Sequence, residues 1–504
     1  MRIDRRAKAA RISIEAAALL LAAGASAPGA LSVIGGPTYT PGVGGYLDPY
    51  QVASAPNGTY AAYGPYVNND GVAIGYAQKL DAAVTSLGYR ALRWSASSSD
   101  ELGNLGLDAT DSTFCYVRAI NSAGLAVGEA KKHDQTIDKG ARAVRWAAPG
   151  TTATQLGDLG TDNSGYTDSR AYAVNASGTT VGSANKYSGN IGLGSRAVRW
   201  DAAGINATEL DNIGTDGGGT TNAVANAINS AGTAVGWANK HIGMQAYQRA
   251  VRWNAGGTAA TELGTNLTDF VRTQALAISD GGAAVGYGDA GDPSQPRPIR
   301  WAADGTGTKL LNPAGWSESS TSGQATAINA SGVAVGVATK TDENDWGRRA
   351  VRWGASNVNG TELATLGVHP TEGYTLSEAF AINTDGLAVG YALSSADPDN
   401  PVEHAVYWTA DGAAHDLNLL IDANSGWVLN RANSISDTGW ITGVGMYDPD
   451  GEGGQDAYQR LFLLQLPEPS ALGAIALGLC GLLWRRRSLN SAIGNPQSPR
   501  TPSS

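Results

Sequence analysis

The chain has 504 residues, a net charge of −10, 67 glycines, 4 phenylalanines and 2 cysteines. The acidic balance argues against a general nucleic-acid binder, which needs a basic surface to neutralise phosphates. High glycine with few Met and Phe is unlike a helical bundle and predicts a glycine-rich all-β chain. Two cysteines cannot build a disulfide framework, and no Cys/His spacing suggests a zinc site.

Residues 1–30 have the order of a secretory signal peptide. A basic stretch containing Arg5 and Arg6 precedes an apolar run over Ala16–Ala23, and small residues follow around Ser26. This order predicts export from the cytoplasm. A basic N-terminus without a signal function is the alternative.

A string of the form Ala-Ile-Asn-x-x-Gly-x-Ala-Val-Gly recurs along the middle of the chain, at Ala119–Gly128, Ala227–Gly236 and Ala327–Gly336. A second string, Arg-Ala-Val-Arg-Trp, ends at tryptophans that recur every 48 to 55 residues. A Thr-Glu-Leu string follows several of these tryptophans. Such a period indicates a repeat architecture.

Each unit divides into four short strands, here called A to D. Strand A is Ala-x-Ala-Ile, and Asn-x-x-Gly is a tight turn in which Asn bonds its own backbone and Gly takes a positive φ. Leu-Ala-Val-Gly-x-Ala is strand B, Arg-Ala-Val-Arg-Trp is strand C, and the Thr-Glu-Leu segment is strand D. Four antiparallel strands per roughly 50 residues predict one blade of a β-propeller. A solenoid is less consistent with this period.

Eight A–B hairpins predict eight blades over residues 31–465, with seven blades or an open array as alternatives. The hairpins end at Gly75, Gly128, Gly182, Gly236, Gly286, Gly336, Gly390 and Gly443. The last unit lacks a strand D, and about 35 residues (Leu31–Pro65) precede the first hairpin. We therefore expect the N-terminal segment to supply that strand, so that first and last strands close the ring and remove the exposed sheet edges.

The repeats resemble the HAF-type extracellular repeat over about residues 60–465. The resemblance rests on His404–Trp408, on Ala381–Asn383 before it, and on Leu-Gly-x-Leu-Gly segments such as Leu102–Gly106. It implies an exported bacterial protein and leaves the biochemical role undefined. Most units carry Arg where that repeat has His.

Residues 466–487 resemble the PEP-CTERM sorting signal of Gram-negative bacteria. Pro467, Glu468 and Pro469 precede a short apolar helix over Ala471–Trp484, which is closed by arginines. Its 14 apolar residues fall short of the roughly 20 that span a bilayer, and the arginines hold that end at the cytoplasmic face. The arginines are Arg485, Arg486 and Arg487.

This resemblance implies processing by an exosortase, with the inner membrane touched only through the C-terminal segment, and delivery to the cell surface or matrix. A plain tail anchor is the alternative. Residues 488–504 form a polar tail, either a real extension or a mis-called stop. Loss of both ends leaves residues 31–466 with a net charge of −16 and with Cys115 as the only thiol. That thiol is expected to be buried.

No nucleophile elbow, phosphate-binding loop or Cys/His pair is present, so no catalytic residue is predicted. A carboxylate pair brought together from distant units would make the protein an enzyme instead. The five histidines are expected to be solvated loop residues. They are His133, His241, His369, His404 and His415.

Two recurring charge patterns are candidate sites. The second arginine of strand C recurs beside an acid of strand D, which predicts ion pairs between blades, with ligand binding as the alternative. These pairs are Arg199 with Glu209, Arg252 with Glu262, and Arg352 with Glu362. A lysine also recurs four residues after the strand-B glycine. The set is Lys79, Lys132, Lys186, Lys240 and Lys340.

The lysines are expected on the rim that carries the B–C and D–A connections, where they could attract an acidic exopolysaccharide. Alternatively they solvate the rim or pair with loop acids such as Asp134, Asp138 and Asp342. The last B–C loop is a weak calcium candidate, with a plain acidic turn as the alternative and no other cofactor predicted. Its oxygen ligands would be Asp448, Asp450, Glu452 and Asp456.

The sequence thus predicts a non-catalytic structural or adhesion propeller of the bacterial envelope or matrix. A secreted polysaccharide-active enzyme and a protein-binding surface scaffold are the alternatives. An exposed apolar patch on one face would favour the scaffold.

Overall fold

The structure is a computed structural model. It describes residues 32–33, 63–80, 85–96, 98–316, 322–342, 345–369, 372–395, 402–448 and 457–466. Contacts divide the chain into a unit of residues 30–464 and a second unit of residues 1–29 with 465–504. The predicted signal peptide, the sorting signal from Pro467 to Arg487 and the polar tail lie outside the described residues. Among the described residues, no helix is long and apolar enough to cross a membrane.

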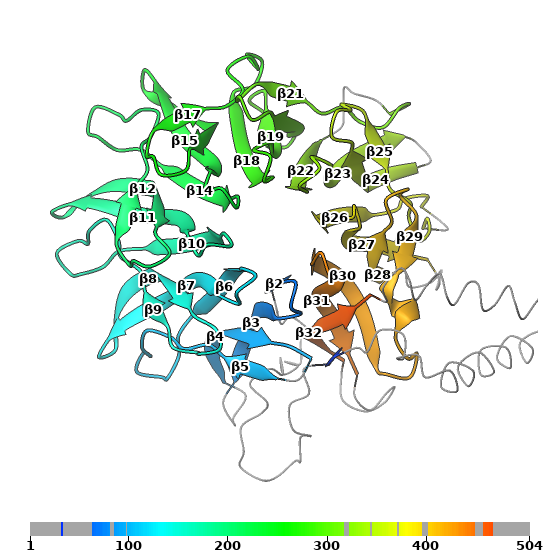
Figure 1. Cartoon of the computed structure of the whole chain (residues 1–504), viewed down its shortest axis with the longest axis horizontal. Coiled ribbons are helices and arrows are strands. Elements are labelled where there is room, and N and C mark those ends of the chain that lie inside the picture. Colours follow the sequence, from blue (N-terminus) through cyan, green and yellow to red (C-terminus); the bar gives the residue numbers. More distant parts are fainter. Residues whose placement is uncertain are drawn as a thin grey trace, which may run out of the picture. The chain divides into compact units, whose positions relative to one another are not determined.

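The first unit is an eight-bladed β-propeller in which every blade is a four-stranded antiparallel sheet (Figure 1). Blade 1 consists of β2 (Tyr63–Val67), β3 (Ala73–Leu80), β4 (Ser86–Trp94) and β5 (Ser99–Glu101). Blade 2 consists of β6 (Cys115–Ile120), β7 (Ala126–Asp134), β8 (Ile137–Trp146) and β9 (Thr154–Gln155). Blade 3 consists of β10 (Ser169–Val174), β11 (Thr180–Ser188), β12 (Ile191–Trp200) and β13 (Ala207–Glu209).

Blades 4 to 6 repeat the same order. Blade 4 consists of β14 (Ala223–Ile228), β15 (Ala234–Ile242), β16 (Gln245–Trp253) and β17 (Ala260–Glu262). Blade 5 consists of β18 (Arg272–Ile278), β19 (Ala284–Asp289), β20 (Arg297–Trp301) and β21 (Gly307–Lys309). Blade 6 consists of β22 (Gly323–Ile328), β23 (Ala334–Asp342), β24 (Asp345–Trp353) and β25 (Gly360–Glu362).

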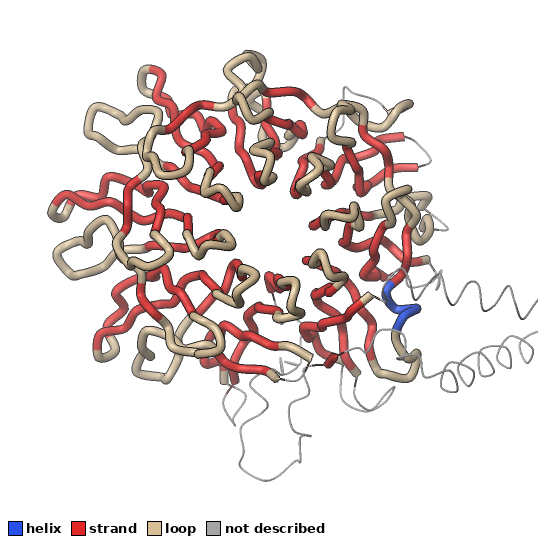
Figure 2. Tube along the Cα trace, viewed as in Figure 1, coloured by secondary structure: helices blue, strands red, loops and turns tan. Residues whose placement is uncertain are grey.

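The last two blades include the one helical turn among the described residues. Blade 7 consists of β26 (Ser377–Ile382), β27 (Ala388–Ser394), β28 (Val402–Trp408) and β29 (Ala414–Asp416), and the 3₁₀ turn η1 (Leu417–Leu420) follows it. Blade 8 consists of β30 (Trp427–Ile435), β31 (Trp440–Tyr447), β32 (Tyr458–Gln465) and the N-terminal β1 (Ser32–Val33). Strand A lies innermost in each blade, and turns and loops surround the strands (Figure 2).

The N-terminal segment closes the ring, as the sequence predicts. Strand β1 pairs antiparallel with β32, where Ser32 faces Leu463 and Val33 faces Phe462. Polar contacts join blades 8 and 1 as well, because Asp437 accepts a hydrogen bond from the Asn69 side chain and its N–H donates to that side chain at 2.9 Å. The predicted count of eight blades is confirmed.

The A–B turns have the predicted chemistry. In blade 4 the Asn229 Oδ1 accepts the Thr233 N–H at 2.9 Å, and Gly232 has a φ of 88°. The Asn229 Nδ2 also donates to the Ser279 carbonyl of blade 5 at 3.2 Å, so the turn residue joins neighbouring blades. A second glycine, Gly236, is needed for space, because a Cβ there would lie 1.9 Å from the Val224 carbonyl oxygen of strand A.

The hydrophobic core is distributed between neighbouring blades. One cluster, for example, combines Val181, Ala197 and Leu210 of blade 3 with Val251 and Trp253 of blade 4. The strand-C tryptophan is fully buried in seven blades, and in five of them its indole N–H donates to a carbonyl of the previous blade. The Trp253 Nε1 donates to the Asp211 carbonyl at 2.8 Å, and Trp200 donates to the Gly157 carbonyl at 2.9 Å.

In blades 1 to 6, the second arginine of strand C joins the blade to the next one. Arg199 donates to the carbonyls of Gly257 at 2.9 Å and Asn254 at 3.1 Å in blade 4. Arg93, Arg145, Arg252, Arg300 and Arg352 bond corresponding carbonyls of the blade that follows each of them. Burial lowers the pKa of Arg199 from its ordinary value, with a smaller opposing effect of Asp201. The carbonyl dipoles thus stabilise a buried guanidinium.

Cys115 lies in this core, as expected. Its side chain has no solvent exposure, and burial raises the pKa of the thiol to about 12. The thiolate is therefore absent at neutral pH, and the side chain packs as a small apolar group.

Replacing Arg199 with lysine should lower the free energy of unfolding by about 1–3 kcal/mol, because an ammonium cannot reproduce the planar fork that bonds several carbonyls. Urea unfolding followed by tryptophan fluorescence measures the change. Arg170→Lys is the control, because that side chain is 44% exposed. Equal stability of the Arg199→Lys variant and the wild type would contradict this role.

Candidate polyanion-binding face

The five predicted lysines lie at corresponding places in five blades. Each stands near the end of the second strand, close to the B–C connection, in β3, β7, β11, β15 and β23. The incoming D–A segments pass beside two of them, because Leu105 bridges to Lys132 and Leu159 bridges to Lys186. The lysines and the D–A loops therefore share one rim of the propeller.

In four blades the lysine and the first arginine of strand C hold one strand-D glutamate between them. In blade 4 the Lys240 Nζ lies 2.7 Å from Glu262 Oε2, and the Arg249 Nε lies 2.8 Å from Glu262 Oε1. We call this Lys–Glu–Arg set the charge cassette. The other cassettes are Lys79–Glu101–Arg90, Lys186–Glu209–Arg196 and Lys340–Glu362–Arg349.

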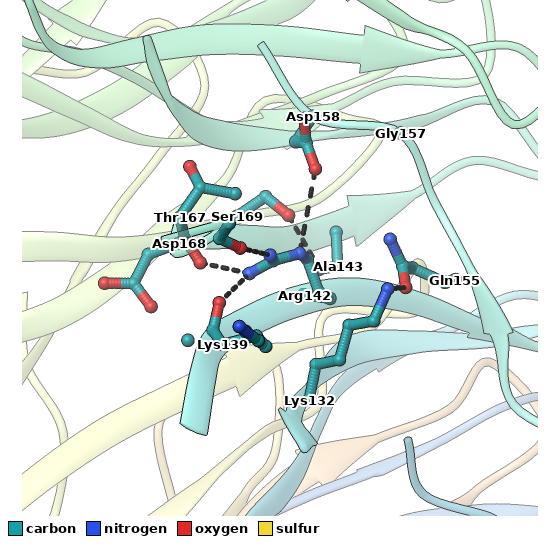
Figure 3. A network of polar contacts seen from close by, with 12 residues as sticks. Lys132, Lys139, Arg142, Ala143, Gln155, Gly157, Asp158, Thr167, Asp168 and Ser169 are labelled. Carbon is teal, nitrogen blue, oxygen red and sulfur yellow. Dashed lines mark hydrogen bonds and ion pairs between the residues drawn. The ribbon is translucent and has the colours of Figure 1, made fainter. Parts of the chain in front are cut away.

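Blade 2 has a variant cassette (Figure 3). Gln155 replaces the glutamate, and its Oε1 accepts from Lys132 at 3.0 Å. Arg142 instead pairs with Asp158, at 3.6 Å. Arg142 also donates to the carbonyls of Lys139 at 2.6 Å and Thr167, so it fixes the loop that leads to blade 3.

The predicted pairing of the second arginine with the strand-D glutamate is wrong. Arg199 lies opposite Thr208, whereas Val198 lies opposite Glu209, so Arg199 and Glu209 point to opposite faces of the sheet. Arg196, two residues before Val198, shares the face of Glu209 and pairs with it at 3.2 Å. The same register applies to Arg252 with Glu262 and to Arg352 with Glu362.

The lysines of the cassettes are more exposed than the arginines. The Lys186 and Lys240 side chains are 37% and 42% exposed, whereas Arg196 is 3% exposed. Each complete cassette contains two cations and one carboxylate, so it carries one net positive charge at the rim. Pairing of the lysines with loop acids such as Asp138 was the alternative expectation. Asp138 instead pairs with Lys131, the neighbour of Lys132, at 2.6 Å.

The D–A loops of the same rim contain regularly placed aspartates. Hydrogen bonds within the loops hold the pKa of Asp108, Asp162 and Asp216 below the ordinary range, chiefly bonds from Thr110, Ser164 and the Thr220 N–H respectively. These carboxylates are therefore ionised at neutral pH. The rim thus carries alternating positive and negative positions rather than a continuous basic surface.

The histidines are mostly strand residues, not loop residues as expected. His133, His241, His404 and His415 lie in β7, β15, β28 and β29. His404 takes the place of the cassette arginine in blade 7, and its Nδ1 lies 2.7 Å from Asp416 Oδ2. Burial alone would raise the pKa of Asp416, but hydrogen bonds from His404 and Asn418 lower it overall.

The calcium candidate falls mainly outside the described residues. Asp450, Glu452 and Asp456 are not described, and Asp448 alone has a place at the end of the loop. Within the described parts of the chain, no group of three His, Cys, Asp or Glu side chains could hold a metal ion.

Two charged clusters on the inner strands escaped the sequence analysis. In blade 2, Glu129 accepts hydrogen bonds from both Nε and Nη2 of Arg118, each at 2.5 Å. In blade 7, Glu378 accepts from Arg348 at 2.9 Å, and burial raises the pKa of Glu378 against the opposing charges of Arg348 and Arg431. Both acids occupy positions at which the residue type varies from blade to blade. The only sequence signal for them was therefore that an acid stands where the other blades have a different residue.

Exposed apolar side chains are found on the B–C hairpins of consecutive blades. Ile137, Ile191 and Met244 lie at the hairpins of blades 2, 3 and 4, and all are more than half exposed. Blade 4 adds a second such side chain on the same hairpin, Ile242, which is 61% exposed.

No family model matches the chain, and no curated protein matches it. Solved structures resemble it at low identity. The β-propeller domain of the Trilobed protease from Pyrococcus furiosus is 11% identical, covers 72% of this chain and 96% of that one, and gives a TM-score of 0.40. A PL25 ulvan lyase is 9% identical, covers 72% and 97%, and gives a TM-score of 0.35. No activity follows for this chain from likenesses at this level.

Replacing Asp416 with asparagine should lower the free energy of unfolding at pH 7 by about 1–2 kcal/mol, because the carboxylate bonds His404 and Asn418. The lowered pKa means that this stabilisation is present above the ordinary value of 3.8 and is lost as the pH falls below it. Denaturant unfolding from pH 3 to 7 measures it, with the exposed Asp385→Asn as control. The same loss at pH 3 as at pH 7 would contradict the charge-based account.

Proposed function

We propose that the chain is an exported, surface-sorted, non-catalytic β-propeller that serves a structural or adhesive role in the bacterial envelope or exopolysaccharide matrix. The charge cassette is the observation that carries the proposal. It places a partly exposed lysine with one net positive charge at the same rim of successive blades. The terminal sequences support export and processing by an exosortase.

A repeating row of positive points suits a repeating polyanion. One exposed ion pair contributes little free energy, about 0–1 kcal/mol. Several weak contacts to one polymer add up, because each contact raises the effective concentration of the next. Lys79, Lys132, Lys186 and Lys240 stand in four consecutive blades, so a single acidic chain could contact several of them.

Replacing the lysines leaves the cassette arginine, which also pairs with the glutamate, in place. A Gln substitution keeps a hydrogen-bond donor, and the buried arginine remains in place. The variant with Gln at all five lysine positions should therefore fold with nearly unchanged stability. Its binding to an acidic exopolysaccharide should be about tenfold weaker at low salt, and less sensitive to added salt.

The binding is measured with purified protein at low and high salt. The control replaces Lys139 and Lys309, which lie outside the cassettes, with Gln. Wild-type affinity of the five-lysine variant would show that the lysines do not bind the polymer. Absence of binding by the wild type would remove adhesion to acidic polymers altogether.

A second candidate function, a polysaccharide-active enzyme, rests on Glu378. A buried carboxyl with a raised pKa has the property of a general acid, and Glu403, bonded to Arg431 at 2.7 and 2.9 Å, is a charged carboxylate that influences its pKa. An enzyme of this kind should release reducing ends from an acidic polysaccharide and lose at least a hundredfold in rate on Glu378→Gln. Absence of new reducing ends with the wild type contradicts it.

A further inference from the structure

Four aromatic side chains gather where blades 1 and 2 meet. Tyr89 and Tyr116 have ring centroids 5.8 Å apart, and Phe114 lies 6.1 Å from Tyr89 and 6.4 Å from Tyr116. The three ring planes lie within 30–40° of one another, whereas Tyr76 packs edge-on against Tyr116 at 4.8 Å. Three similarly oriented rings, supported by a fourth, form one aromatic platform.

The platform is accessible and breaks the repeat. Phe114 is 39% exposed, with the Lys131 Nζ 5.8 Å from the centre of its ring, and it ends the D–A loop on the same rim as the lysines. The positions that correspond to Tyr89, Phe114 and Tyr116 hold no aromatic residue at the junctions of blades 2 and 3 and of blades 3 and 4. They are Ala141, Asp168 and Arg170 at the next blade junction and Ser195, Asn222 and Val224 at the one after it. Packing between blades therefore does not require these rings.

A partly neutralised cationic group continues the platform into blade 3. Tyr116 lies directly opposite Glu129 in the sheet, so their side chains share one face. Glu129 is buried and bonds Arg118 with both oxygens, while Arg170 reaches the same carboxylate only at 3.9 Å. Two guanidinium groups thus share one carboxylate, which leaves one net positive charge beside the rings.

Arg170 is the available member of this group. Its side chain is 44% exposed, and its contact to Glu129, at 3.9 Å, is too long for a hydrogen bond. Its planar guanidinium is suited to bind a carboxylate with two parallel hydrogen bonds. Arg118, by contrast, is held by Glu129 and lies over the Tyr172 ring at 5.2 Å.

We propose that Tyr89, Phe114, Tyr116 and Arg170 form a binding strip for a uronic-acid-containing polysaccharide. The C–H faces of sugar rings stack on aromatic rings, whose faces carry partial negative charge. The uronate carboxylate is the group that complements Arg170. This inference rests on the proposed adhesive function and names the polymer class and the place where it is recognised.

The test compares polygalacturonate, which is charged, with its methyl ester, which has the same sugar rings without the charge. Phe114→Ala should weaken binding of both polymers about five- to tenfold, because it removes a stacking surface. Arg170→Gln should weaken binding of polygalacturonate about tenfold and leave binding of the ester unchanged. Titration calorimetry on the purified full chain measures both affinities.

Two variants on other blades serve as controls. Met244→Ala removes an exposed apolar side chain in blade 4, and Arg272→Gln removes a partly exposed guanidinium in blade 5. Neither should change the affinity. Control losses as large as those of the strip variants would overturn the inference.

The outcomes separate the strip from the proposed function. Binding that survives in Phe114→Ala and Arg170→Gln but disappears in the five-lysine variant overturns the strip and leaves the adhesive function in place. No binding of polygalacturonate by the wild type, together with binding of another acidic polymer, has the same meaning. Failure of every acidic polymer overturns both.

Discussion

The contact between one blade and the next is the interaction on which the whole structure depends. Two side chains of strand C make it in opposite directions: the tryptophan donates to a carbonyl of the preceding blade, and the second arginine donates to carbonyls of the following one. A buried guanidinium without a carboxylate is costly unless dipoles surround it. Arg199 finds those dipoles only when the next blade is in place, so a blade that carries this arginine needs its neighbour. The ring itself is closed by the pairing of β1 with β32.

This use of the charges changes how the sequence should be interpreted for function. The most frequent ionisable residues of the repeat are occupied: the second arginines by carbonyls, the first arginines by glutamates and loop carbonyls, and the glutamates by both cations of the cassette. A side chain that recurs in most blades therefore first serves the fold. Residues that break the repeat, such as Phe114, Arg170 and Glu378, are the ones that packing does not explain.

Local chemistry made most of the fold predictable. The Asn-x-x-Gly turn specifies its own geometry, so the eight hairpins followed from residues close together in sequence. The closing strand followed from the missing strand D of the last unit. The partner of Glu209 could not be predicted in the same way. A shift of one residue in the register of the two strands decides whether Arg196 or Arg199 lies on the same face of the sheet as Glu209. The pairing of His404 with Asp416 was missed for a related reason: His404 replaces an arginine whose partner was unknown.

A polyanion can be attracted to the rim by long-range electrostatics or held there by short-range contacts, and the charges of the rim favour the second. Ionised aspartates such as Asp162 alternate with the net positive cassettes, so long-range attraction is weak and salt screens it within about 8–10 Å. Discrimination between polymers must come from short-range contacts. At the junction of blades 1 to 3, Tyr116 lies opposite Glu129 in the sheet, and the incompletely neutralised Arg170 approaches the same carboxylate at 3.9 Å. There the alternation of charges matters least, because stacking needs no net charge and the guanidinium acts at hydrogen-bond distance.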